Sequence, residues 1–233
     1  IVVNYGVAST LGWNLAGGIP MMKNAYEMPW FITTAIMGAV FLYLFNLMAK
    51  CTAELGVAVS SLASKLSLVI PIAVFLIIDP SDVLTPRKLI ALSLAVLAIL
   101  LSSLGDDSKH ISQSKWAFIL PLVIFFGSGA IDLVFAWFSN PDHIPTNEHA
   151  IAFTSVPFTI AFITGAVIGV YKPNISLPSK NDLLAGVFLG VVNFGSLFFL
   201  IGAYSTPGVD KSILIQGVNL GVVLFSTLAA VAI

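Results

Sequence analysis

The sequence predicts an all-α polytopic membrane protein with eight transmembrane helices, and three observations carry this prediction. Of the 233 residues, 58% are hydrophobic and only 9% are charged, whereas about a quarter of the residues in a soluble domain are charged. Long apolar runs alternate with short polar connections along the whole chain. Runs such as LIALSLAVLAILLSSL (89–104) are apolar on every face, as membrane helices are, and lack the alternation of membrane strands.

The apolar runs are expected to form the eight helices in the order 1–18, 30–49, 57–78, 87–104, 116–138, 149–171, 183–204 and 211–233. At about 1.5 Å per residue, each can cross a hydrocarbon layer about 30 Å thick with modest thinning. Helix breakers fill the connections, as in DPSDVLTP (79–86), GDDSKHISQSK (105–115) and YSTPGVDK (204–211). Trp30, Trp116 and Trp137 fall near helix ends, where aromatic side chains anchor membrane proteins.

Composition also bounds the partners. With a net charge of −1, nothing points to nucleic acid, and the expected partners are the lipid bilayer and a small-molecule substrate. No cofactor or metal-ligand cluster is visible, and a single cysteine excludes an intrachain disulfide. Successive connections would lie on opposite sides of the membrane. The connections of one side carry five Lys or Arg residues and those of the other side carry four, a difference too small to fix the orientation of the protein in the membrane. The chain starts on IVVNYG and stops on LAAVAI, so we expect a fragment or a chain trimmed at both ends.

A weak internal repeat suggests two opposed halves. Sliding the chain by 154 residues aligns residues 45–69 with 199–223, with five identities and a shared helix–turn–helix layout. The helices expected at 57–78 and 211–233 would then run in opposite directions, as in the inverted repeats of many transporters. The expected division is a first repeat at 1–104, a linker at 105–115 and an inverted second repeat at 116–233.

Lys65 is the most unusual residue, because the run around it, SSLASKLSLVIPIAV (60–74), is otherwise made of Ser, Ala, Leu, Val, Ile and Pro. It lies eight residues into the expected helix, about 12 Å deep, where facing lipid would cost about 2.5–3.5 kcal/mol. The serines of this helix, Lys65 and Pro71 fall within one arc of about 160°: Ser60, Ser61, Ser64, Lys65, Ser67 and Pro71. We expect this arc to line a substrate cavity. The alternative is a structural lysine that is paired with a carboxylate. The best internal partner of Lys65 is Asp132, which we expect to be a coupling or counter-ion site.

Other polar residues are candidates for the same cavity. Asn219 is the repeat partner of Lys65 and shares an arc with Gln216, Ser212 and Ser226. Asn46 and Asn193 are further candidates, although an interhelical hydrogen bond is the favoured interpretation for asparagines in apolar helices. The same principle assigns Gly186 and Gly190, at GxxxG spacing, to close helix packing. The charged residues Lys50, Glu54, Asp210 and Lys211 are expected to be solvated in short turns.

Residues 45–103 resemble helices 3 to 5 of EamA-like transporters of the drug/metabolite transporter superfamily. A helix ending in a Pro-containing apolar run leads to the turn DVLT (82–85), where the family has Glu-x-Leu-Thr, and Ala91 stands where Gly is usual. GSGAID (127–132) and GVNLGVVLFSTL (217–228) resemble the second half of the family. The resemblance implies a ten-helix (5+5) inverted repeat, of which this chain would be helices 2 to 9. It also implies that the helices expected at 30–49, 57–78, 183–204 and 211–233 line the substrate path. The implied location is the bacterial plasma membrane, and a homodimer is one possible assembly.

The preferred hypothesis is a secondary transporter that moves a small polar metabolite by alternating access, and not an enzyme. No GxxxxGK[ST] loop for ATP is present. One rival is a membrane enzyme acting on lipid or prenyl phosphates, but such chemistry needs several grouped carboxylates and the chain offers only the pair Asp106–Asp107. Another rival is a scaffold or sensor that does not transport, in which Lys65 would be a packing device.

Overall fold

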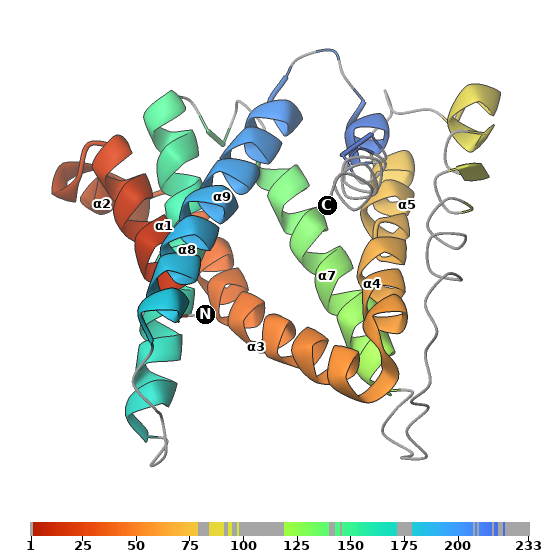
Figure 1. Cartoon of the computed structure of the whole chain (residues 1–233). Coiled ribbons are helices and arrows are strands. Elements are labelled where there is room, and N and C mark those ends of the chain that lie inside the picture. Colours follow the sequence, from red (N-terminus) through yellow and green to blue (C-terminus); the bar gives the residue numbers. More distant parts are fainter. Residues whose placement is uncertain are drawn as a thin grey trace. The chain divides into compact units, whose positions relative to one another are not determined.

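The computed structural model describes residues 2–78, 84–90, 93–94, 97, 119–139, 143–144, 146–171, 179–206, 208, 210–215, 217–218 and 221. Every regular element in these ranges is an α-helix (Figure 1). The helices are α1 (Val2–Leu15), α2 (Ile19–Tyr26), α3 (Phe31–Leu55), α4 (Val57–Leu66), α5 (Val69–Ile78), α7 (Ile119–Phe138), α8 (Asn147–Tyr171) and α9 (Lys180–Tyr204).

Five helical stretches are long and apolar enough to cross a membrane. They are Phe31–Leu55, Val59–Ile78, Ile119–Phe138, Asn147–Tyr171 and Lys180–Tyr204. The prediction of an all-α protein with several membrane-spanning helices is therefore confirmed. Most of the spans expected at 87–104 and 211–233, and all of the linker expected at 105–115, lie outside the described residues. The total of eight spans and the inverted repeat stay predictions.

Three elements differ from the sequence prediction. The connection expected between 18 and 30 contains the helix α2. Helix α3 continues to Leu55, six residues beyond the expected end, so Lys50 and Glu54 lie on a helix and form an i,i+4 ion pair of 3.8 Å. Lys50 and Glu54 are not in a turn, because no helix-breaking residue lies between the expected helix end at 49 and Gly56. The helix ends at Gly56, which has a φ of +91°. The run 57–78 is interrupted between α4 and α5.

The described chain forms two compact units, each of which draws on both expected halves of the sequence. Unit 1 comprises Ile1–Tyr43 and Val134–Thr206, and unit 2 comprises Leu44–Leu133 and Pro207–Ile233. Helices α3 and α7 each pass from one unit into the other. The units are thus not the expected repeats, and the division into inverted halves stays a prediction.

In unit 1, α1 packs against α8 and α9. A Cβ atom added to Gly186 of α9 would lie 2.9 Å from Val3, and one added to Gly190 would lie 2.7 Å from Val7. The GxxxG spacing therefore does serve close helix packing, as predicted. Ring contacts fill the rest of this core, from Trp30, Phe41, Phe135, Phe153 and Phe158.

In unit 2, the core joins α3, α4 and α7. Cys51 of α3, Ala63 of α4, and Leu120 and Ile124 of α7 form one buried apolar cluster. This cluster fixes α4 against α7 and so positions the polar residues that follow Ala63.

Candidate functional site

The candidate site is a break in the membrane span Val59–Ile78. Helix α4 ends at Leu66 and α5 begins at Val69, with Ser67 and Leu68 in a turn between them. Pro71 has no amide hydrogen, so it cannot donate to the carbonyl of Ser67 as an α-helix requires. That carbonyl instead accepts from the amide of Ile70 at 3.0 Å, and the carbonyl of Lys65 accepts from the amide of Leu68 at 3.4 Å. These are the tighter i→i+3 bonds of a 3₁₀ turn.

Lys65 lies in the last turn of α4, directly before this break, and is half-buried. The carbonyl groups at the end of a helix carry a partial negative charge that favours a cation there. Ser61 and Ser64 of α4 are also half-buried. The hydroxyl of Ser67 is buried and donates to the carbonyl of Ser64, so part of the polar backbone at the break is satisfied locally.

One serine of the predicted polar arc has a packing role. Ser60 is buried, and its hydroxyl donates to the backbone carbonyl of Met48 in α3 at 3.2 Å. This bond ties α4 to α3 next to the apolar cluster of unit 2. Ser60 is therefore occupied in helix packing, one turn before Ser64 and Lys65.

Helix α7 brings a carboxylate to the break. A Cβ atom added to Gly129 would lie 2.9 Å from the carbonyl oxygen of Ser67 and 2.5 Å from the side chain of Ile70, so the two backbones touch at this point. Asp132 follows one turn later on α7 and is half-buried. Its charge interacts with that of Lys65. Among the described residues, no ion pair joins Lys65 and Asp132.

The remaining predicted site residues are not all gathered here. Asn46 lies on the part of α3 that belongs to unit 2 and is exposed. Asn193 belongs to α9 in unit 1, where its amide nitrogen donates to the side-chain oxygen of Asn4 in α1 at 3.1 Å. That bond is the interhelical alternative considered for Asn193. Gln216 and Asn219 lie outside the described residues, as do Asp106 and Asp107 of the rival enzyme hypothesis.

The sequence did not predict an ion pair in unit 2 that joins a buried lysine to a half-buried aspartate. The ammonium of Lys88 lies 2.6 Å from a carboxylate oxygen of Asp210, and the Lys88 side chain is 9% exposed. Thr85 caps the helical turn that carries Lys88, since its hydroxyl accepts from the Lys88 amide at 3.3 Å, and Pro86 follows at the first helical position. The sequence Thr-Pro could have placed Lys88 in a first helical turn, but nothing in the sequence indicates its distant partner.

Lys211 is also engaged rather than solvated. Its ammonium group lies 5.2 Å from the centre of the Phe75 ring in α5, within the range of a cation–π interaction. The expectation that Asp210 and Lys211 are solvated in a turn is therefore wrong. Lys211 holds the start of the helical residues 211–215 against α5, and Asp210 holds it against the helical turn that carries Lys88.

The fold and the site thus define a helical membrane protein with a broken span that carries a lysine. No family model matches the chain, and no solved structure matches it. A relative in Haemophilus influenzae is 26% identical over 195 residues, which is 82% of this chain and 63% of that protein. The chain therefore spans less than two thirds of the relative, whose description reads "Uncharacterized protein".

Proposed function

We propose that the protein is a secondary transporter that moves a small polar metabolite by alternating access. The observation that carries this proposal is the break at Ser67–Leu68 within a membrane span, with Lys65 in the turn before it. Backbone that leaves the regular helix inside a membrane is tolerated where it is covered by protein or lines a cavity. Transporters use such broken helices to bind substrate near the middle of the membrane.

The charges at the break indicate the class of substrate. The Lys65 ammonium can donate to a carboxylate or phosphate group, and the serine hydroxyls of Ser61 and Ser64 can add weaker hydrogen bonds. Asp132 can accept from a positively charged group on the other side of the same ligand. The pair therefore favours an anionic or zwitterionic metabolite, with Asp132 as counter-ion or as the site of a coupling cation or proton.

The resemblance to EamA-like transporters supports the same proposal. We propose the ten-helix inverted repeat of that family for the whole fold, with 57–78 and 211–233 as equivalent helices and with Asn219 and Gln216 facing the substrate from the second half. Gly129 and Asp132 belong to GSGAID, one of the stretches that carry the resemblance, and Gly129 is the residue that touches the break.

A ligand screen on the purified protein tests the proposal. A ligand that binds the native state raises the melting temperature in a concentration-dependent way. Wild type, Lys65→Met and the control Lys180→Met, at the exposed start of α9, would be screened against a metabolite library. We expect an anionic or zwitterionic ligand to stabilise wild type and the control but not Lys65→Met. If Lys65→Met stays folded and keeps every ligand, Lys65 does not bind the substrate.

Uptake into proteoliposomes separates transport from binding alone. The ligand found in the screen should enter vesicles that contain wild-type protein, saturably and in response to an ion gradient. Binding without uptake would contradict the transporter proposal and favour a sensor. Chemical conversion of the ligand would favour an enzyme.

A further inference from the structure

We infer that α2 lies in the headgroup layer of the bilayer, with Ile19, Met22 and Tyr26 against the lipid and with Lys23 and Tyr26 binding a phospholipid phosphate. This inference concerns unit 1 alone and does not rest on the transport proposal. It gives the eight-residue helix that the sequence did not predict a specific partner.

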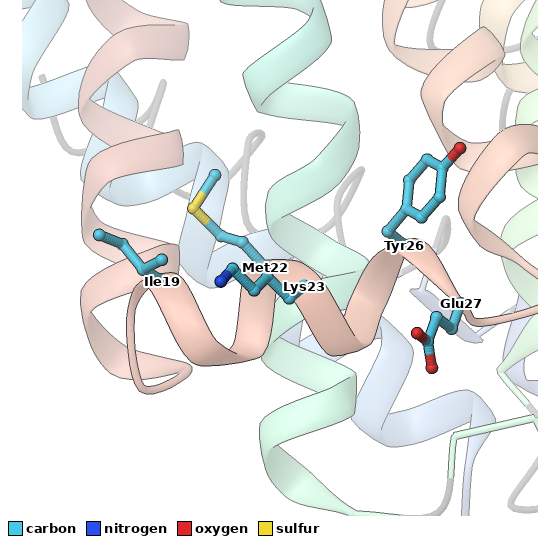
Figure 2. Close-up of a pocket in the computed structure, with 5 residues that line it drawn as sticks. All are labelled: Ile19, Met22, Lys23, Tyr26 and Glu27. Atoms are coloured by element: carbon cyan, nitrogen blue, oxygen red, sulfur yellow. The ribbon is translucent and has the colours of Figure 1, made fainter.

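The orientation of α2 is the first support. Figure 2 shows α2 lying across α8, which it contacts, and α8 is one of the candidate membrane spans. A helix that lies across a span runs along the membrane plane. The chain makes this turn at Gly17 and Gly18, whose φ angles of +100° and +73° lie in the left-handed region that glycine adopts without strain.

The faces of α2 are the second support. Met21 and Ala25 are buried against the rest of unit 1, whereas three large side chains of the opposite stripe are exposed: Ile19 at 70%, Met22 at 41% and Tyr26 at 72%. At about 100° per residue, these three and Lys23 fall within an arc of about 100°. An apolar stripe that includes a tyrosine and has a lysine at its edge is the pattern of helices that lie in a membrane interface.

The direction of the side chains agrees with a lipid partner. In Figure 2, Met22 and Tyr26 rise from the same side of α2 as most of the α1 ribbon, and Glu27 points to the other side. The apolar stripe therefore points to the side of α2 on which most of α1 lies, and the carboxylate of Glu27 points to the opposite side. This is the arrangement expected when hydrocarbon lies on one side of α2 and water on the other.

The recess over this stripe fits a headgroup. Ile19, Met22, Lys23 and Tyr26 line a shallow pocket of about 550 Å³, whose lining also includes Glu27, although the carboxylate of Glu27 points to the other side of α2 in Figure 2. Lys23 and Tyr26 lie about one helical turn apart along α2, and their ammonium and hydroxyl groups, which point in different directions in Figure 2, are both hydrogen-bond donors for phosphate oxygens. Ile19 and Met22 offer apolar contact to the first carbons of the acyl chains.

Spin-label accessibility measures the depth of α2 directly. In a Cys51→Ala background, the full chain would be labelled at Met22→Cys and placed in vesicles that contain phosphatidylglycerol. Two references calibrate depth, Ser179→Cys in the exposed cap before α9 and Ile163→Cys on the exposed side of α8. We expect the Met22 label to collide with oxygen more, and with a water-soluble nickel complex at least twofold less, than the Ser179 label. A label as accessible to nickel as Ser179, or shielded from both reagents by protein, overturns the inference.

Charge reversal tests the phosphate contact. Lys23→Glu should raise the collision rate of the Met22 label with nickel at least twofold, because it replaces the phosphate donor with a repelling carboxylate. Asn24→Glu places the same carboxylate at the adjacent exposed position of α2, with a charge change of −1 against −2 for Lys23→Glu, and should leave the rate unchanged. Equal effects of the two variants, or no effect of either, show that Lys23 does not bind the phosphate.

Discussion

An ammonium and a carboxylate that share a membrane interior lower the cost of each other's charge, so Lys65 and Asp132 should be coupled in stability. We expect a double-mutant cycle of Lys65→Met and Asp132→Asn to give a coupling free energy of about 0.5–3 kcal/mol. Each single variant leaves one uncompensated charge in a half-buried position, whereas the double variant leaves none. Unfolding in mixed micelles would measure the four stabilities. A coupling free energy of zero would show that the two charges act independently.

The two ion pairs that the structure describes within unit 2 should differ sharply in what they contribute. Lys88→Met should lower the free energy of unfolding by about 1–4 kcal/mol, because it leaves the carboxylate of Asp210 without its 2.6 Å partner. Lys50→Met should change it by less than about 0.5 kcal/mol, since the 3.8 Å pair with Glu54 is exposed. Denaturation of both variants at two salt concentrations would check this. Similar losses in the two variants would contradict a special role for Lys88.

At the scale of the element, the missing amide hydrogen of Pro71 contributes to the break between α4 and α5, but it does not act alone, because Pro157 lies inside the unbroken helix α8. Pro71→Ala restores a donor for the carbonyl of Ser67, and we expect α4 and α5 to join into one helix. Ligand binding should be lost while the stability is unchanged or higher. Hydrogen exchange would show protection of the new amide at position 71. The control is Pro157→Ala in α8, which should leave binding intact; equal loss of binding in both variants would remove the link between the break and function.

The close approach of α7 to the break makes Gly129 sensitive to any side chain. Gly129→Ala should destabilise the protein by about 1–3 kcal/mol, because its methyl group would lie 2.5–2.9 Å from Ile70 and the Ser67 carbonyl. Gly195→Ala in α9 has no neighbour within 4 Å and should be neutral or stabilising by up to about 1 kcal/mol. Thermal unfolding of the two variants gives the comparison. A neutral Gly129→Ala would show that α7 can move away from the break.

At the scale of the whole molecule, composition predicts the class and periodicity predicts the long helices, because a membrane allows few alternatives to apolar helices. The break was foreseeable in part, since Pro71 marks the carbonyl of Ser67. Helix α2 was not, because the ten residues between Gly17–Gly18 and Pro29, eight of which form α2, look like a connection. The pairing of Lys88 with Asp210 depends on contacts between distant segments, which no local pattern reveals.

The grouping of the candidate site residues was only partly foreseeable for the same reason. The stripe around Lys65 follows from helical periodicity. Its neighbour Asp132 could be proposed because few carboxylates lie inside apolar runs. Asn193 fits the same compositional rule, yet it lies in unit 1 and bonds to Asn4. A polar residue in an apolar run indicates that a partner exists, but the fold decides whether that partner is a ligand or another helix.

The depth of Lys65 also has an electrical consequence. It lies six residues beyond Val59, the start of a 20-residue span, or about 9 Å into a layer about 30 Å thick. A monovalent anion that reaches Lys65 from that side crosses about a third of the membrane voltage, worth about 0.8 kcal/mol per 100 mV. We expect the dissociation constant of such a ligand to change about fourfold when 100 mV is imposed on proteoliposomes. A dissociation constant that ignores the voltage would place the binding charge outside the field.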